Sequence, residues 1–232
     1  MKFTNKDVLL FDLDGTLIDS VPDLALSVNQ MLKSLGMNTY PINEIRSWVG
    51  NGAAVLTKRA LSGSINIKAD LNADLVEKAL ATFLDYYQQN VCVDTTVYPN
   101  VASTLAALHN RGYQMVIVTN KPEQFVRPIL EKLGLNTYFS MIVGGDSLSK
   151  RKPDPMQLHY VCEQLNVSES QCIMIGDSKN DIHAAVAANM DSIALTYGYN
   201  HGEDIHSHGA NVVLDDFAEL IDVLDTIGEP VS

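Results

Sequence analysis

The sequence predicts an α/β fold, a doubly wound parallel sheet into which an all-helical domain is inserted. Short apolar runs alternate with longer amphipathic stretches, as expected where crossover helices join parallel strands. From about residue 20 to residue 92 the alternation stops and only helical periodicity remains. We therefore expect an α/β core formed by residues 1–16 and 93–232, and a helical domain formed by residues 17–92.

Six apolar runs of strand length form the expected sheet. They are Val8–Phe11, Met115–Val118, Met141–Val143, Cys172–Ile175, Ser192–Leu195 and, as a candidate edge strand, Val212–Leu214. The stretches at about 99–111, 122–133, 155–165 and 179–189 are the expected crossover helices. The pair Asp154-Pro155 is typical of a helix start, because a carboxylate can cap the helix and proline fits its first position.

The helical interval contains one strongly amphipathic segment, Leu71–Gln89, with apolar residues near i, i+4 and i+8 spacing. Such a face suits packing against neighbouring helices. Since the interval follows the first strand, it should cover the carboxyl edge of the sheet, where open α/β sheets bind their ligands.

Composition excludes several classes of partner. The chain carries 28 acidic and 16 basic side chains, a net charge of -12. This charge repels phosphate backbones and anionic lipids, so we expect neither nucleic acid nor membrane as a partner. The three cysteines lie far apart in the sequence, which argues against a zinc site or a disulfide framework. With no apolar leader at the start and no apolar stretch of ~20 residues, the sequence predicts a cytoplasmic protein.

Acidic residues follow two of the predicted strands. Asp12 and Asp14 end the first, and a spacing of two in extended chain puts both side chains on one side. Asp177 and Asp181 end the fourth. The alternatives are a simple turn at Asp12 and Asp14 and, for Asp181, a capping box with Ser178.

If these two strands are neighbours, the acids converge. Two carboxylates ~4 Å apart repel by about 4 kcal/mol at an effective dielectric of 20, so the cluster requires a cation or raised pKa values. Oxygen ligands without nearby cysteine or histidine favour a hard ion, and we expect Mg²⁺.

Two further strand exits carry polar groups suited to phosphate. Thr119 and Asn120 follow the second strand, and Lys152 precedes the third crossover helix. A hydroxyl, an amide and an ammonium can each bind a phosphoryl oxygen. The alternatives are a helix N-cap for Thr119 and a solvated basic turn for Lys152.

These motifs, in this order and each after a predicted strand, resemble the four motifs of the haloacid dehalogenase superfamily, with its Rossmannoid core and helical C1 cap. They are Asp12-x-Asp14-Gly15-Thr16, Thr119, Lys152-Pro153 and Gly176-Asp177-Ser178-x-x-Asp181. The match spans nearly the whole chain and implies a phosphatase that forms an aspartyl phosphate.

The resemblance also implies a role for each motif residue. Asp12 would be the nucleophile and Asp14 the general acid and base. Mg²⁺ would be held by Asp12, the backbone carbonyl of Asp14 and Asp177, with Asp181 supporting them. Thr119 and Lys152 would bind the phosphoryl oxygens.

Four segments narrow the resemblance to superfamily members that hydrolyse 2-phosphoglycolate to glycolate and phosphate. They are Trp48–Ala53, Val118–Pro122, Gly144–Asp146 and Leu195–Asn200. Backbone N–H groups of Gly50, Asn51 and Gly52 could bind a small carboxylate, with Arg59 or Lys58 nearby. The alternative is that these glycines only turn the chain.

Several rival functions stay open at this point. A phosphomutase, or a phosphatase for another small phosphorylated metabolite, would keep every core residue. A dehalogenase would not need an acid and base at Asp14. A receiver-like phosphoacceptor module shares the clustered acids but is usually about half as long and has no cap. The sequence leaves open whether the protein is a monomer or a homodimer.

Overall fold

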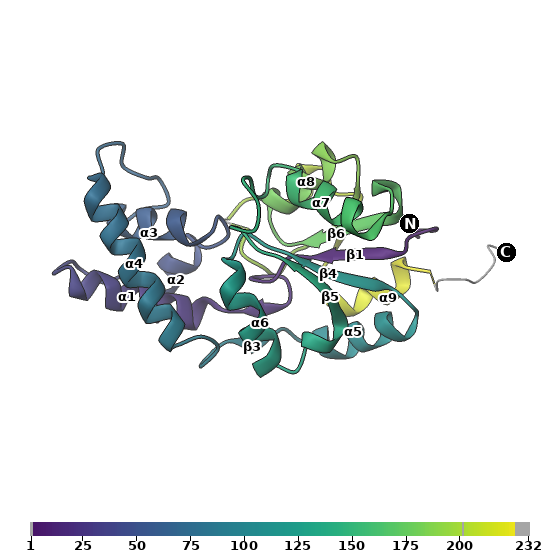
Figure 1. Ribbon diagram of the computed structural model, residues 1–232, viewed down its shortest axis with the longest axis horizontal. Helices are drawn as coiled ribbons and strands as arrows, with labels where there is room; N and C mark the ends of the chain where they lie inside the picture. Colours follow the sequence, from purple (N-terminus) through teal and green to yellow (C-terminus); the bar gives the residue numbers. More distant parts are fainter. Residues whose placement is uncertain (1, 201, 226–232) are drawn as a thin grey trace.

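The computed structural model describes residues 2–200 and 202–225, and its centre is a six-stranded parallel sheet (Figure 1). In spatial order the strands are β5 (Phe139–Val143), β4 (Gln114–Val118), β1 (Val8–Phe11), β6 (Cys172–Gly176), β7 (Asp191–Leu195) and β8 (Val212–Leu214). All six predicted strands are confirmed, and the last of them forms an edge. The central strand, β1, pairs with β4 and β6 because its four residues are apolar and buried on both faces.

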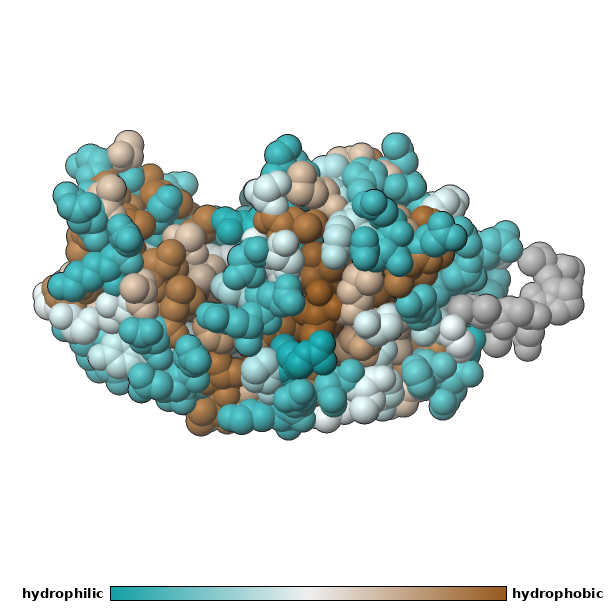
Figure 2. Space-filling view, viewed as in Figure 1, coloured by the Kyte–Doolittle hydropathy of each residue, from teal (hydrophilic) through white to brown (hydrophobic). Residues whose placement is uncertain are grey.

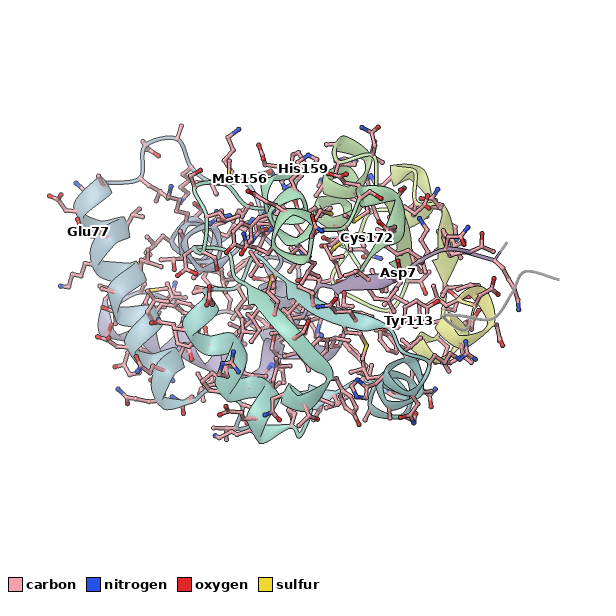
Figure 3. All side chains as sticks on the ribbon, turned by 45° about the vertical axis from the view of Figure 1, so that its right-hand side comes forward. Asp7, Glu77, Tyr113, Met156, His159 and Cys172 are labelled. Atoms are coloured by element: carbon pink, nitrogen blue, oxygen red, sulfur yellow. The ribbon has the colours of Figure 1, made fainter. Side chains whose placement is uncertain are left out.

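The register brings the carboxyl ends of the central strands to the same level. Phe11, the last residue of β1, lies opposite Ile117 of β4 and Ile175 of β6. Figure 3 shows Asp7 and Tyr113 beside the amino ends of β1 and β4, far from Glu77 of the helical insert. The residues that follow the strands therefore meet at the edge facing the insert.

Helices cover both faces of the sheet, as the doubly wound prediction requires. The helices α5 (Val101–Asn110) and α6 (Glu123–Lys132) pack on one face with α9 (Leu220–Val223). The other face is covered by α7 (Met156–Leu165) and α8 (Lys179–Ala187). Alternate residues of β1 divide between the two hydrophobic clusters, Leu9 and Phe11 in one and Val8 and Leu10 in the other.

Short 3₁₀ helices complete the connections of the core. They are η1 (Asn136–Tyr138), η2 (Glu169–Gln171), η3 (Ile205–His208) and η4 (Phe217–Glu219).

Four helices lie between β1 and α5, and they form a separate layer at the left of Figure 1. They are α1 (Val21–Ser34), α2 (Ile42–Arg46), α3 (Ala53–Ser62) and α4 (Ala73–Gln89). The predicted amphipathic segment corresponds to α4, which buries Ala79, Phe83 and Tyr87. Figure 2 shows hydrophilic side chains spread over both parts of the molecule, with a hollow between the insert and the core at the upper edge of the view.

A second, two-stranded sheet was not predicted. In it β2 (Ile18–Asp19) pairs antiparallel with β3 (Thr96–Val97), joining the segments that enter and leave the helical insert. Two-residue strands are too short to give a periodic signal. The carboxylate of Asp23 reinforces the connection by accepting hydrogen bonds from the backbone N–H groups of Val93, Asp94 and Thr95.

Among the described residues, 2–200 and 202–225, no helix is both long and apolar enough to cross a membrane.

Candidate active site

Three carboxylates meet at the carboxyl edge of the sheet. Asp12 follows β1, Asp177 follows β6 and Asp181 lies in the first turn of α8, and an oxygen of each lies within 4.8 Å of an oxygen of the others. The expected adjacency of the two strands is confirmed. Burial raises the pKa of Asp12 to about 6, although Lys152 opposes the rise. Burial, followed by the negative charges of Asp12 and Asp181, raises the pKa of Asp177 well above its ordinary value.

Glycines make room for these acids. A Cβ added to Gly15 or Gly198 would come within 2.3 Å or 2.2 Å of the side chain of Asp177, and one on Gly176 within 2.3 Å of Asp181. These distances are far below van der Waals contact. The glycines of both motifs, and the one after β7, therefore let the backbone enclose the cluster.

The cluster fits a divalent cation. Asp12 Oδ1 is buried and makes no hydrogen bond of normal geometry, although the Lys152 ammonium lies 3.2 Å away. Together with Asp14, the site has four carboxylates and two ammonium groups, those of Lys121 and Lys152. When all are ionised the sum is two negative charges, which a divalent ion would neutralise. Carboxylate oxygens are ligands for hard cations.

Lys152 is buried, so the alternative of a solvated basic turn is wrong. Its side chain is 1% exposed, and its ammonium donates to Asp181 Oδ1 at 2.6 Å and to the carbonyl oxygen of Val118 at 2.5 Å. Burial disfavours the charged form, but the negative charges of Asp12 and Asp181 outweigh it and raise the pKa of Lys152. A permanent positive charge therefore lies beside Asp12.

Asp181 forms the capping box considered for it and also binds Lys152. Its Oδ2 accepts hydrogen bonds from the backbone N–H of Ser178 at 3.0 Å and from the Ser178 hydroxyl at 2.8 Å, which confirms the capping box. Its Oδ1 binds Lys152. One carboxylate thus starts α8 and also fixes the lysine next to Asp12.

Asp14 lies beside this cluster and is held from two sides. Its Oδ1 accepts a hydrogen bond from the Ser20 hydroxyl at 2.6 Å, and the Lys121 ammonium lies 3.0 Å and 3.1 Å from its two oxygens. The sequence analysis did not identify Lys121, although it directly follows Thr119 and Asn120. A lysine at the start of a helix looks like a surface residue, yet this side chain is 3% exposed.

Thr119 does not cap a helix. Helix α6 begins at Glu123 with Pro122 at its N-cap, and the Thr119 hydroxyl instead accepts a hydrogen bond from the Lys121 N–H at 3.2 Å. Thr119 is buried at the carboxyl end of β4 and lines the same cavity as Asp12 and Asp14.

Asn120 connects the core to the insert. Its amide nitrogen donates to the carbonyl oxygen of Gly50 at 3.2 Å and to that of Lys152 at 3.0 Å, whereas its Oδ1 has no partner among the described residues. Gly52 comes so close that an added Cβ would lie 2.8 Å from the Asn120 carbonyl oxygen, and its φ of +83° also favours glycine.

The four predicted substrate-binding residues of the insert lie in different places. Gly50 and Gly52 line the cavity above Asp12. Asn51 instead donates to Asn180 Oδ1 at 3.3 Å. The guanidinium of Arg59 donates to the backbone carbonyls of Trp48 at 2.6 Å and Ile65 at 3.1 Å, within the insert. The structure therefore brings the two glycines, but not Arg59, to the site.

The cavity between the two parts is small, about 40 Å³. On the core side it is lined by the polar residues Asp12, Asp14, Thr119, Asn120 and Lys121. The wall contributed by the insert is mainly apolar and comprises Leu24, Val49, Ala53, Leu56, Phe83 and Tyr87. Such a space suits a small ligand.

A further set of contacts, which the sequence analysis missed, supports Asp177 and joins it to the insert. The Thr16 hydroxyl and the backbone N–H of Tyr199 each donate to Asp177 at 2.6 Å. The Tyr199 hydroxyl donates to Asp19 Oδ1 at 2.6 Å, and Asp19 also accepts two hydrogen bonds from Arg46 of α2 at 3.0 Å and 2.8 Å. Thr16 lies within the first motif and Tyr199 within the segment Leu195–Asn200, whereas Asp19 and Arg46 had no sequence signal.

Comparison with known proteins agrees with this geometry. Residues 9–195 match the family model of the haloacid dehalogenase-like hydrolases. The chain therefore belongs to the haloacid dehalogenase-like hydrolase family, and the resemblance inferred from the motifs is confirmed.

Within this family the chain is a close homologue of bacterial phosphoglycolate phosphatases. It is 52% identical to the phosphoglycolate phosphatase of Colwellia psychrerythraea, covering 95% of this chain and 98% of that protein. It is 48% identical to that of Psychrobacter arcticus, covering 95% and 96%. The crystal structure of a predicted phosphoglycolate phosphatase from Haemophilus somnus superposes with a TM-score of 0.88 at 38% identity, covering 95% of this chain and 98% of that one.

Proposed function

We propose that this protein is a Mg²⁺-dependent phosphatase that hydrolyses 2-phosphoglycolate to glycolate and phosphate. One observation carries the proposal: Asp12 is a buried carboxylate whose Oδ1 accepts no hydrogen bond of normal geometry, placed between two other acids and the Lys152 ammonium group at the mouth of a small cavity. The identity of 46% or more to several phosphoglycolate phosphatases along almost the full chain supports the substrate.

Asp12 is proposed as the nucleophile. Its carboxylate oxygen forms a bond to phosphorus while the bond from phosphorus to the ester oxygen breaks, which leaves an aspartyl phosphate. Lys152, 3.2 Å from Asp12 Oδ1, offsets the negative charge that otherwise repels the incoming phosphoryl group. The Thr119 hydroxyl, at the end of the neighbouring strand, binds a phosphoryl oxygen.

Asp14 is proposed as the general acid and base. It gives a proton to the ester oxygen of the departing glycolate and then takes a proton from the water that attacks the aspartyl phosphate. Its hydrogen bond to Ser20 and its ion pair with Lys121 fix the position of the carboxylate beside the cavity.

The carboxylates of Asp12 and Asp177 and the backbone carbonyl of Asp14 would hold the metal, with Asp181 behind them. When bound, Mg²⁺ neutralises these acids and polarises the phosphoryl oxygens. Burial and the charges of neighbouring acids raise the pKa values of Asp12 and Asp177, and a bound cation would stabilise both carboxylates in their charged form.

Residues 17–92 are proposed as a cap domain on a core of residues 1–16 and 93–232. The short β2 and β3 strands, which lie at the two crossings, support this division. In the cap, Gly50 and Gly52 are proposed to contact the substrate through their backbone. We further propose that the protein is a monomer or homodimer and that it works in the cytoplasm. The reducing conditions there would keep Cys162 and Cys172, whose sulfurs lie 3.7 Å apart, as thiols.

The proposal is tested by assaying a panel of phosphomonoesters, including 2-phosphoglycolate, with Mg²⁺ and with EDTA. We expect 2-phosphoglycolate to give the highest kcat/KM, and activity to require the metal. Asp12→Asn should lower kcat at least ~10³-fold because the covalent route is lost. Normal turnover by Asp12→Asn would refute the mechanism.

The same experiment separates the rivals. A phosphomutase would release an isomeric phosphate ester, which product analysis by ³¹P NMR detects. A phosphoacceptor module would accumulate a stable aspartyl phosphate on Asp12 without turnover. Rapid release of inorganic phosphate excludes both.

A further inference from the structure

We propose that Lys121 of the core and Tyr87 of the insert together bind the carboxylate of the substrate and thereby select phosphomonoesters that carry an anionic group next to the ester. This inference rests on the proposed function and deepens it by naming the residues that recognise the non-transferring part of the substrate.

Lys121 is the ammonium group available to a ligand in the cavity. The other lysine of the site, Lys152, already contacts Asp12, Asp181 and the Val118 carbonyl oxygen. Lys121 contacts Asp14 alone among the carboxylates described, and it lines the cavity. An ammonium group has three N–H donors, and the two oxygens of Asp14 take at most two of them. A donor and part of the charge are left for a second anion.

Tyr87 supplies the partner from the insert. Its ring lies 4.7 Å from the Lys121 ammonium, and its side chain is 1% exposed. The hydroxyl makes no hydrogen bond of normal geometry with any described residue. Burial raises the pKa of Tyr87 to about 12, with the nearby Lys121 charge opposing the rise, so the group is a neutral donor. A buried hydroxyl without a partner is unfavourable, and an acceptor on a ligand would satisfy it.

The position of this pair matches the shape of 2-phosphoglycolate. Asp14, the proposed donor to the ester oxygen, is in direct contact with Lys121. In 2-phosphoglycolate one methylene separates the ester oxygen from the carboxylate. A carboxylate therefore reaches the vicinity of Lys121 and Tyr87 when phosphorus lies at Asp12.

The apolar wall strengthens the contact. Leu24, Val49, Leu56 and Phe83 line the same cavity as the pair. Charges attract more strongly where water is excluded. The insert therefore contributes to carboxylate recognition through the Tyr87 hydroxyl and through the low polarity of its wall.

The test compares 2-phosphoglycolate with ethyl phosphate, in which a methyl group replaces the carboxylate. Lys121→Met should lower kcat/KM for both esters, because it removes a partner of Asp14. The loss should be about 30-fold larger for 2-phosphoglycolate than for ethyl phosphate, because only the first substrate also loses a charged contact. Tyr87→Phe should lower kcat/KM for 2-phosphoglycolate about 10-fold and spare that for ethyl phosphate, since it removes one hydrogen bond. Lys132→Met and Tyr86→Phe, which change residues outside the cavity, are the matched controls.

Equal losses for both substrates would overturn the inference, because they would show that Lys121 acts only by orienting Asp14. If Lys121→Met does not fold, as judged by circular dichroism, Tyr87→Phe decides the question by the same comparison. The inference is also overturned if the wild-type enzyme shows no higher kcat/KM for any carboxylated ester than for the corresponding neutral ester. If it prefers a different carboxylated ester, only the assigned substrate is wrong, and both variants should lose that preference.

Discussion

The α/β core and the helical insert contribute to the cavity in different ways. The core places acids, a threonine and two lysines at strand ends. All of them except the half-buried Asp14 are buried, and polar partners hold residues such as Lys152 and Asp181 in place. The insert contributes mainly apolar side chains and one buried hydroxyl, that of Tyr87. This difference indicates that the core supplies the groups for one reaction, whereas the insert determines which ester fits beside these groups.

The largest effect should follow from changing a metal-binding carboxylate of the core. Asp177→Asn keeps the size of the side chain but removes one of three clustered acids. At about 1 mM Mg²⁺ we expect kcat/KM to fall ~10³-fold, which corresponds to a loss of about 4 kcal/mol of transition-state stabilisation. High Mg²⁺ should restore part of it.

Asp85→Asn, on the exposed side of α4 in the insert, is the control and should have wild-type activity. A loss of similar size in Asp85→Asn would show that the core and the insert are not specialised as described.

The same acids should make the metal-free protein sensitive to pH. The folded-state pKa of Asp12 is raised from 3.8 to about 6, and that of Asp177 is raised as well. The native state therefore binds more protons than the unfolded state in this window, and stability falls as the pH rises through it. In EDTA, the free energy of unfolding should be about 1 kcal/mol higher at pH 5 than at pH 7.5 from Asp12 alone.

Urea denaturation at the two pH values measures this difference. Asp177→Asn should reduce the difference in stability between the two pH values. Adding Mg²⁺ at pH 7.5 should restore the stability that the wild-type protein loses at this pH. A metal-free wild type that is equally stable at both pH values would contradict the electrostatic account of the core.

A smaller effect is expected where the insert touches the core. In Gly52→Ala the new Cβ would lie 2.8 Å from the Asn120 carbonyl oxygen, so the turn that closes the cavity must move away. We expect kcat/KM for 2-phosphoglycolate to fall about 30-fold, since misplacement of about 1 Å at a catalytic site has effects of this order.

Gly36→Ala is a matched control because Gly36 has a similar φ, +70°, but open space around its Cβ position. Both variants place a side chain at positive φ, and Gly52 also has a ψ of 167°, a combination that glycine adopts far more readily than other residues. Comparing their kinetics and melting temperatures therefore separates the effect of positive φ alone from the effect of changing the turn at Gly52. Equal activity in the two would indicate that the turn does not need to approach Asn120.

The smallest effect should come from the ion pair between the insert and the segment that enters it. Arg46 of α2 binds Asp19 of β2 through two nitrogens, and both side chains are partly exposed. Arg46→Lys keeps the charge but loses the paired geometry, so we expect a loss of about 3-fold in kcat/KM, or less than 1 kcal/mol. Arg127→Lys, on the exposed side of α6, should have no effect.

Much of the core could be predicted because its signals are local. Each buried strand is a continuous apolar run, and Asp12 and Asp177 follow such runs directly. Parallel strands in a sheet end at one edge, so the meeting of these acids followed from their positions. The β2 and β3 strands could not be predicted, since two residues give no period and their pairing joins segments far apart in the chain.

The sequence by itself therefore determined the fold family, the order of the strands along the chain and the acids available for catalysis, because these depend on local patterns of polarity. Only the tertiary structure decided the surroundings of each side chain. Arg59, with a charge suited to a carboxylate, is bound to backbone carbonyls in the insert, whereas Tyr87, apparently one more apolar residue of an amphipathic helix, lies beside Lys121. Such placements depend on how the insert packs on the core, and no short stretch of sequence encodes that packing.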